Sequence, residues 1–355
     1  MKSDPLVSIV IATFNSERTL PLVLDSIRKQ TYPQHCIEIL IIDGGSTDTT
    51  LVIARKFHCR VINNLKVEPL YAKYLGYCQA RGKYITYIDH DEVIGNPESI
   101  VRKVAVFCDN QKVKAVVASG YSSPKGYHII NRYINEFGDA FSFFIYRLSK
   151  NGDFFLKTMR ERYTVIRDEK YCTIVDLSSS QTIPLIELGA GGGMFDGDFF
   201  KQTFPEIKEH YHLIPHFLHL LRGNFPFLAI MKNDVLIHYS SDNFGGYIKK
   251  IIWRVKNNIF FKETIGASGF SGRENYQSSQ VWLKKFIFLP YAFTLIGPTI
   301  DAIYLIITRR DVSYIIHIPL TIITASLIVY YSMLKTLGLK PRLTSYDGST
   351  PAYEK

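Results

Sequence analysis

Two carboxylates one residue apart, Asp89 and Asp91, follow a short apolar run of β-branched and aromatic residues at 84–88. Such a run, bounded by polar residues, is typical of a buried strand. Alternate side chains of a strand share a face, so we expect both carboxylates to point the same way. Mg²⁺ or Mn²⁺ suits such oxygen ligands, since these ions take one or two carboxylates and complete their shell with phosphate oxygens. A solvated acidic turn would have the same sequence, so the neighbouring segments must decide.

The segments before this pair predict the elements that would position it. Apolar runs predict strands at 6–13, 37–42, 60–63 and 83–88, and apolar residues at helical spacing predict helices at 16–29, 49–57 and 69–81. This alternation predicts an α/β fold with a mostly parallel sheet flanked by helices. Ligands of such sheets lie beyond the carboxyl ends of the strands. The polar clusters at 13–16, 43–48 and 89–92 all follow strands, so we expect them to converge on one site.

The net charge indicates the class of binding partner, and the cysteine content indicates the cellular compartment. The chain has 355 residues and a net charge of +10, which favours anionic partners such as nucleotide phosphates or lipid head groups. No nucleic-acid-binding signature accompanies the charge, so we expect no nucleic-acid partner. The five cysteines form no Cys-x-x-Cys pair, which is typical of reduced thiols in the cytosol.

Four segments together resemble a family-2 glycosyltransferase: VSIVIATFNSERTL, IEILIIDGGSTDTT, YAKYLGYCQARGKYITYIDHDEVI and GAGGGMF. The resemblance is clear over about residues 6–100 and weaker to about 260. It implies a GT-A (Rossmann-like) fold, a nucleoside-diphosphate-sugar donor, a uracil base and inversion at the transferred sugar. We do not expect a NAD-binding Rossmann enzyme, because no G-x-G-x-x-G follows the first strand.

The resemblance also implies roles for residues of the donor half. The nucleoside would contact Thr13, Asn15 and Asp43, the ribose Asp89, the metal Asp91, and the diphosphate Lys73. A lone lysine such as Lys73 could equally be a solvated surface charge. Gly191, Gly192 and Gly193 resemble the wall beside the donor sugar, although a glycine run also suits a surface turn. His238 would complete the metal shell or be an ordinary buried histidine.

Other polar residues of the two loops are better explained as helix caps. Ser46 and Asp48 are placed to cap the helix at 49–57, and Asp196 to cap a helix that begins before Phe199 and Phe200.

The acceptor half departs from the family pattern. Where the family has an acidic pair, this chain has Tyr211 and His212. His212 could act as the general base, since its pKa suits proton abstraction, and Glu209 or His210 could substitute for it. Alternatively the acceptor is a phosphate that needs no base. We do not expect the nearby histidines to hold zinc, because Pro215 disrupts the helix between them.

The C-terminal part is expected to associate with a membrane. Residues 247–261 form an amphipathic basic helix that could lie in a membrane interface or pack against the catalytic domain. The apolar stretches 286–308 and 312–334 are each long enough to span a bilayer. The first contains two prolines and Asp301, so it could be kinked or partly inserted. The lysines outside this hairpin place the catalytic domain in the cytoplasm.

The sequence therefore predicts a glycosyltransferase of the cell membrane, with its catalytic domain on the cytoplasmic side. The expected domains are a catalytic domain at 1–280, a membrane hairpin at 281–340 and a cytoplasmic tail at 341–355. The catalytic domain divides into a nucleotide-binding half, 1–100, and an acceptor half with the interfacial helix, 101–280. The expected reaction transfers a sugar to a lipid-linked or glycan acceptor in cell-surface glycan synthesis. The alternatives are a polyprenyl-phosphate sugar synthase and a degenerate nucleotide-sugar-binding membrane protein.

Overall fold

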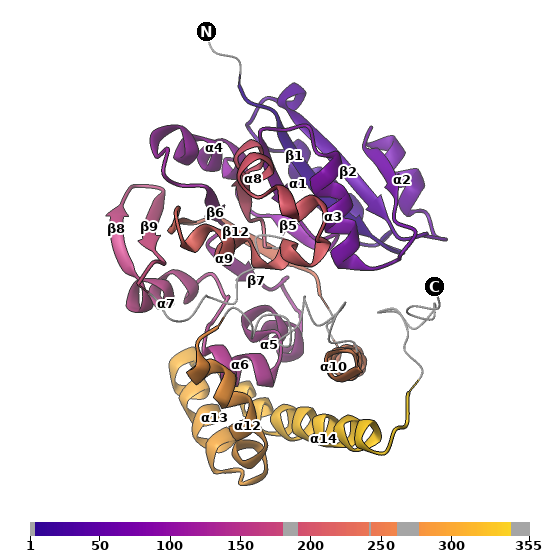
Figure 1. Ribbon diagram of the computed structural model, residues 1–355, viewed down its shortest axis with the longest axis vertical. Helices are drawn as coiled ribbons and strands as arrows, with labels where there is room; N and C mark the ends of the chain where they lie inside the picture. Colours follow the sequence, from indigo (N-terminus) through magenta and orange to yellow (C-terminus); the bar gives the residue numbers. More distant parts are fainter. Residues whose placement is uncertain (1–3, 180–190, 241–242, 261–276, 342–355) are drawn as a thin grey trace. The chain divides into compact units, whose positions relative to one another are not determined.

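The computed structural model describes residues 4–179, 191–240, 243–260 and 277–341, drawn in colour in Figure 1. By packing, the chain falls into two compact units. Unit 1 contains residues 1–124 and 150–239, and unit 2 contains residues 125–149 and 240–355. The functional domain boundaries given above stay a prediction.

Unit 1 is built on a nine-stranded sheet with the strand order β3-β2-β1-β4-β10-β6-β11-β9-β8. The strands are β1 Val7–Thr13, β2 Ile37–Asp43, β3 Arg60–Asn63, β4 Tyr84–Tyr87, β6 Ala115–Val117, β8 Thr164–Asp168, β9 Cys172–Asp176, β10 Met194–Asp196 and β11 Phe227–Met231. A second sheet has the order β5-β12-β7, from β5 Glu92–Ile94, β7 Gly120–Ser122 and β12 Val235–His238. The helices are α1 Leu20–Arg28, α2 Thr50–Lys56, α3 Pro69–Gln79, α4 Ser99–Asp109, α7 Phe155–Arg162, α8 Gly197–Thr203 and α9 Phe217–Arg222, with 3-10 turns η1 Gln34–Cys36, η2 Pro205–Lys208 and η3 Tyr211–His216.

The predicted strand–helix alternation over the first hundred residues is confirmed. The apolar strand β1 is parallel to both β2 and β4, and β2 is parallel to β3, and α3 packs on β1 and β2 (Figure 1). The prediction of a mostly parallel sheet is wrong for the strands after β4, because that part of the sheet is mixed. The strand β10 returns antiparallel between β4 and β6, and β9 is antiparallel to both of its neighbours.

Two local predictions also need correction. The first helix begins at Leu20, not at residue 16, since Ser16–Thr19 forms a turn in which the Ser16 carbonyl accepts from the Thr19 and Leu20 amides. The strand β4 ends at Tyr87, before the carboxylate pair. Asp89 and Asp91 therefore lie in the turn between β4 and β5, and strand alternation does not set their directions.

Unit 2 is helical. It contains α5 Ile129–Phe137, α6 Ala140–Tyr146, α10 Phe244–Phe260, α12 Ser279–Phe293, α13 Ile296–Arg309, η5 Val312–Ile316 and α14 His317–Thr336. The apolar stripe of α10 is buried in this unit: Ile251 and Val255 share a cluster with Leu320 and Tyr331 of α14. Residues 125–149 thus pack with the C-terminal helices.

One helix in the described part of the chain, 312–336, has the length and composition to cross a membrane, with 25 residues and a mean hydropathy of 2.0. The other expected span is broken into α12 and α13, which meet at 89°. The break falls at Leu295, whose φ of 62° is left-handed, between Pro290 and Pro298. The expected kink is therefore present, but it is sharp enough to separate two short helices.

Candidate active site

The loops that follow β1 and β2 are joined by side-chain hydrogen bonds. The Asn15 amide donates to Ser46 Oγ at 2.9 Å, and the Thr47 amide donates to Asn15 Oδ1 at 2.9 Å. Asn15 adopts a left-handed conformation, with φ of 46°, which asparagine tolerates better than most residues. This link holds the two carboxyl-terminal loops together, as their position at adjacent parallel strands predicts.

Asp43 lies at the centre of these loops and is 2% exposed. Its carboxylate accepts hydrogen bonds from Thr13 Oγ1 at 2.9 Å and from the Gly45 and Ser46 amides at 2.9 and 2.8 Å. Ser46 Oγ donates to the same carboxylate at 2.5 Å. Most acceptor positions of Asp43 are thus used to shape its own loop. Thr13 and Asp43 are brought together as predicted, and their hydrogen bonds shape the loop after β2.

The predicted cap at Ser46 is wrong, because its hydroxyl bonds Asp43 and Asn15. Asp48 does accept from the Thr50 amide at 2.9 Å, at the start of α2, and also from the Glu17 amide at 3.1 Å. The cap predicted at Asp196 is confirmed by a 3.1 Å hydrogen bond from the Phe199 amide.

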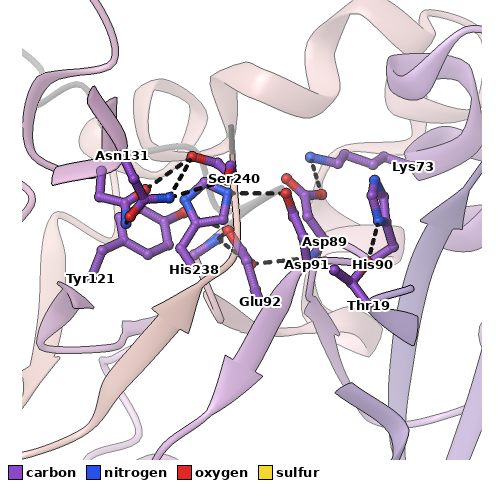
Figure 2. Close-up of polar contacts among 12 residues, drawn as sticks. Thr19, Lys73, Asp89, His90, Asp91, Glu92, Tyr121, Asn131, His238 and Ser240 are labelled. Atoms are coloured by element: carbon purple, nitrogen blue, oxygen red, sulfur yellow. Dashed lines mark hydrogen bonds and ion pairs between the residues drawn. The ribbon is translucent and has the colours of Figure 1, made fainter. Parts of the chain in front are cut away.

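In the turn after β4, the two carboxylates of the Asp-x-Asp pair have different partners. Lys73 Nζ of α3 lies 3.1 Å from Asp89 Oδ1. His90 turns away and pairs through Nδ1 with Thr19 Oγ1 at 3.1 Å (Figure 2). Lys73, which is predicted to contact the diphosphate, therefore faces Asp89.

Asp91 faces His238, at the end of β12. Asp91 Oδ2 lies 3.4 Å from His238 Nε2, and their side chains are 18% and 14% exposed. The Tyr239 amide donates to the Asp91 carbonyl at 2.7 Å, which fixes the strand end against the turn. One carboxylate and one imidazole can hold Mg²⁺ or Mn²⁺ when phosphate oxygens complete the shell. Within the described ranges, no group of three or more His, Cys, Asp or Glu side chains is arranged around a common point.

Glu92 is a site residue that the sequence did not reveal. It is 1% exposed and accepts hydrogen bonds from Tyr121 Oη at 2.6 Å, from the Asp89 amide at 3.1 Å and from the Gly191 amide at 3.2 Å. Burial, with the Asp89 carboxylate nearby, raises the pKa of Glu92 to about 7. No signal in the neighbouring sequence marks it, because its partner Tyr121 lies 29 residues away.

The glycine run lies beside this turn over its described part, residues 191–193. Gly191 and Gly192 have positive φ values of 65° and 61°, which favour glycine. The Gly193 carbonyl accepts from the Tyr87 amide at 3.3 Å. Glu92 therefore joins the Asp-x-Asp turn to the glycine run, while Gly189 and Ala190 lie outside the described residues.

The residues predicted for acceptor activation lie on η2 and η3. His212 is half-buried, and its ring centroid is 5.4 Å from that of His210. Burial, and then the neighbouring His210, lower the pKa of His212 below its ordinary value. Glu209 is exposed at the end of η2. The turn η3 packs on α3, the helix that carries Lys73, and Tyr211 packs edge-on against Tyr71 at 5.6 Å.

Comparison with known proteins relates the N-terminal part of the chain to one protein family. Residues 8–170 match the model of glycosyl transferase family 2. A poly(ribitol-phosphate) beta-N-acetylglucosaminyltransferase, TarS of Staphylococcus aureus, is 32% identical over 110 residues, which cover 29% of this chain and 18% of the relative. A poly(ribitol-phosphate) beta-glucosyltransferase of Bacillus spizizenii is 32% identical over 112 residues, or 30% of this chain and 18% of the relative.

The chain therefore spans about a fifth of the length of these two relatives. Among solved structures, the mannosyltransferase PcManGT of Pyrobaculum calidifontis, in complex with GDP-Man and Mn2+, is similar in fold. Its TM-score is 0.52 at 13% identity, over 95% of this chain and 88% of PcManGT. Residues 8–170 are therefore similar to glycosyl transferase family 2, and the likeness to PcManGT shows an α/β, GT-A-like fold.

Proposed function

We propose that this protein is a metal-dependent, inverting glycosyltransferase that moves a sugar from a nucleoside-diphosphate sugar to an acceptor at the cytoplasmic face of the cell membrane. The observation that carries the proposal is the pairing of Asp91 with His238 at 3.4 Å, beside Lys73 and Asp89. This arrangement presents an oxygen, a nitrogen and a cation at the strand ends where α/β folds bind ligands.

The donor would lie along the loops after β1, β2 and β4. Thr13, Asn15 and Asp43 would line the nucleoside pocket, with the base a uracil. Asp89 would accept a hydrogen bond from a ribose hydroxyl, because one of its oxygens remains after the contact with Lys73. The Lys73 ammonium, 13% exposed, would then balance charge on the diphosphate.

Asp91 and His238 would hold Mg²⁺ or Mn²⁺ against the diphosphate. When bound, such a cation supplies charge stabilisation for the leaving nucleoside diphosphate. Gly191, Gly192 and Gly193 would let the sugar ring approach the backbone. Glu92 would keep the Asp89 amide and the Gly191 amide at a fixed separation. The distance between the diphosphate and sugar subsites would then be fixed as well.

His212 would take the proton of an acceptor hydroxyl. Its lowered pKa keeps the imidazole neutral at pH 7, which a general base requires. Glu209 is the second candidate for this role. Two relatives named for transfer to poly(ribitol phosphate) support a glycan or lipid-linked acceptor in cell-surface glycan synthesis.

A polyprenyl-phosphate sugar synthase is the second candidate function. It is favoured by one observation: η3 carries Tyr211 and His212, and no carboxylate, at the acceptor position. A phosphate acceptor is already ionised at neutral pH, so it needs no base.

The membrane fraction containing the full chain is assayed for nucleoside-diphosphate release from UDP-glucose, UDP-N-acetylglucosamine and GDP-mannose, with Mn²⁺ or with a chelator. Turnover that needs Mn²⁺ and is lost in Asp91→Ala is the expected result. Asp198→Ala removes an exposed carboxylate of α8 and serves as the matched control. Turnover that survives Asp91→Ala undamaged contradicts the metal role. Absence of turnover with every donor and acceptor leaves the degenerate binding protein as the explanation.

His212→Ala separates the two transferase functions, since only the synthase would keep full turnover with a polyprenyl-phosphate acceptor.

A further inference from the structure

The C-terminal apolar helices raise the question of how the chain meets the bilayer. A hairpin of two spans would carry its turn, residues 309–311, across a hydrocarbon core of about 30 Å. The contacts of this turn, of α13 and of α14 all bear on whether such a crossing can occur. The inference that follows rests on the membrane attachment proposed above.

The turn is bound to a segment adjoining unit 1 in sequence. Arg309 Nη2 lies 2.6 Å from Glu136 Oε1, and Ser149 Oγ donates to the same oxygen at 2.8 Å. Glu136 is 0% exposed. Ser149 is followed directly by Lys150, the first residue of the second segment of unit 1. Two side-chain contacts thus link the turn to Ser149, and a bilayer core of about 30 Å does not fit between them.

A second ion pair fixes the other side of the turn. Arg132 Nη1 of α5 lies 2.5 Å from Asp311 Oδ2. The Tyr314 hydroxyl, just after the turn, also donates to Glu136. Because α5 has nine residues, it is too short to carry these contacts through a membrane.

The helices α12 and α13 are individually too short to span. They have 15 and 14 residues, which correspond to about 22 and 21 Å, and they meet at 89°. Asp301, in the middle of α13, is 8% exposed and lies 2.5 Å from Arg147 Nη1, at the end of α6. The charge of α13 therefore faces the interior of unit 2.

Both ends of α14 are held by elements of unit 2 as well. At its start, His317 Nδ1 pairs with Tyr133 Oη of α5 at 2.6 Å. Near its end, the Tyr331 ring lies 6.5 Å from that of Phe260, and Lys335 donates to the Ile259 carbonyl of α10. The helix α10 carries four basic residues: Lys249, Lys250, Arg254 and Lys256. A helix with four cations stays out of hydrocarbon, so neither end of α14 is carried across the core.

The outward faces of α12 and α13 are nevertheless apolar. Leu283, Phe286 and Ile287 of α12 are 52–60% exposed, and Ile296, Ile300 and Ile307 of α13 are 61–68% exposed. A helix with its charge inside and isoleucines outside suits lipid, not water. Trp282 is 40% exposed, and Lys285 Nζ lies 4.6 Å from its ring centroid. This combination is typical of the head-group region of a bilayer with anionic lipids.

We infer that α12, α13 and α14 attach to the membrane from one side only, with the apolar faces of α12 and α13 covered by the acyl chains of a single leaflet. The chain enters and leaves the bilayer on the cytoplasmic side. The turn at 309–311 and the residues after α14 both remain on the side of the catalytic unit.

Labelling with a membrane-impermeant maleimide tests this topology in bacterial cells that express the full chain. The background variant is Cys108→Ser, which removes the cysteine that is exposed in the structure. Arg310→Cys reports on the turn and Leu339→Cys on the end of α14, since both residues are exposed. Val312→Cys replaces Arg310→Cys if that variant does not accumulate.

Both cysteines should be labelled in inverted membrane vesicles and protected in intact spheroplasts, at least tenfold by band intensity. Three patterns would overturn the inference: label at the turn only in spheroplasts, label at residue 339 only in spheroplasts, or label at either site only after detergent. If the chain does not sediment with membranes and runs as a dimer, a second copy of the chain covers the apolar faces, and the inference is wrong. Donor turnover is measured in the same preparations, so a wrong topology is distinguished from a wrong enzymatic function.

Discussion

The Asp91 carboxylate and the His238 imidazole face each other at 3.4 Å, one from the turn after β4 and the other from the end of β12. Because the two side chains face each other and both stay partly exposed, we predict that they act together on one cation. Asp91→Asn and His238→Ala should each raise the Mn²⁺ concentration for half-maximal turnover on the order of 10–100-fold. Titration of activity with Mn²⁺ measures this shift.

His90→Ala is the matched control for the metal site. His90 lies between the two aspartates in sequence but bonds Thr19 at 3.1 Å, so its removal should leave the Mn²⁺ dependence unchanged. An equal shift in all three variants would mean that the turn has lost its shape, which would remove the support for a metal role.

Glu92 should make the stability of unit 1 depend on pH. Its pKa is about 7 in the fold, against 4.5 for an ordinary glutamate, so the fold favours the protonated form. The stability that this preference contributes is complete below pH 4.5 and is lost as the pH rises through 7. Between about pH 5 and pH 8 the wild type should lose up to about 3 kcal/mol, and Glu92→Gln should lose much less.

Chemical unfolding of the detergent-solubilised chain at the two pH values measures this difference. Glu98→Gln is the control, because Glu98 is an exposed partner of Arg102 on α4 and should leave the pH dependence as in the wild type. A Glu92→Gln variant with the full wild-type loss between the two pH values would contradict the prediction.

The first strands could be predicted from sequence because each is a short apolar run bounded by polar residues, and β1 and β4 are buried along almost their whole length. β3 was predicted to the residue, and β1, β2 and β4 to within one residue at each end. The neighbouring loops after β1 and β2 then follow from the parallel arrangement, which is why Thr13, Asn15 and Asp43 could be expected in one place.

Glu92 could not be predicted, because its burial depends on residues distant in sequence. Tyr121 of β7 and the β5–β12 pairing, in which His238 lies opposite Glu92, enclose its carboxylate. A carboxylate next to Asp91 has no local signal that distinguishes burial from solvation. The partners of Asp301 and Arg309 were missed for the same reason, since Arg147 and Glu136 come from a segment expected to shape the acceptor side.

His212 should control the acidic limb of the pH–rate profile. Because its pKa lies below the ordinary histidine value, turnover should be constant from about pH 7 to 8 and fall only below about pH 6.5. His212→Ala should lower turnover on the order of 100-fold and remove this limb. The measurement is initial rate against pH at saturating donor and Mn²⁺.

The variant His210→Ala tests the direction in which His210 shifts the pKa of His212. Proximity of His210 is one of the causes that lower the pKa of His212, so its removal should move the acidic limb to higher pH while the maximal rate is kept. A limb that persists unchanged in His212→Ala would assign the base to another group, and Glu209→Gln would then be the next variant to compare.

Gly76 sets the distance between α3 and β1, and through α3 the position of Lys73. A Cβ at Gly76 would lie 2.1 Å from Val10 Cγ1, a buried residue of β1. Gly76→Ala should therefore push α3 outward and destabilise the fold by about 1–3 kcal/mol. Because Lys73 is one turn away on the same helix, the apparent donor affinity should fall as well. The measurements are the unfolding midpoint and the KM for the donor.

The double variant Gly76→Ala with Val10→Ala separates steric overlap from the loss of glycine itself. Removing the Val10 methyl groups frees the space that the new Cβ needs, so the double variant should be more stable than the sum of the two single effects predicts. Gly223→Ala is the matched control, since nothing lies within 4 Å of its added Cβ and its stability should change by less than about 0.5 kcal/mol. Strictly additive effects at Gly76 and Val10 would show that the contact does not position α3, and Lys73 would then owe its place to other packing.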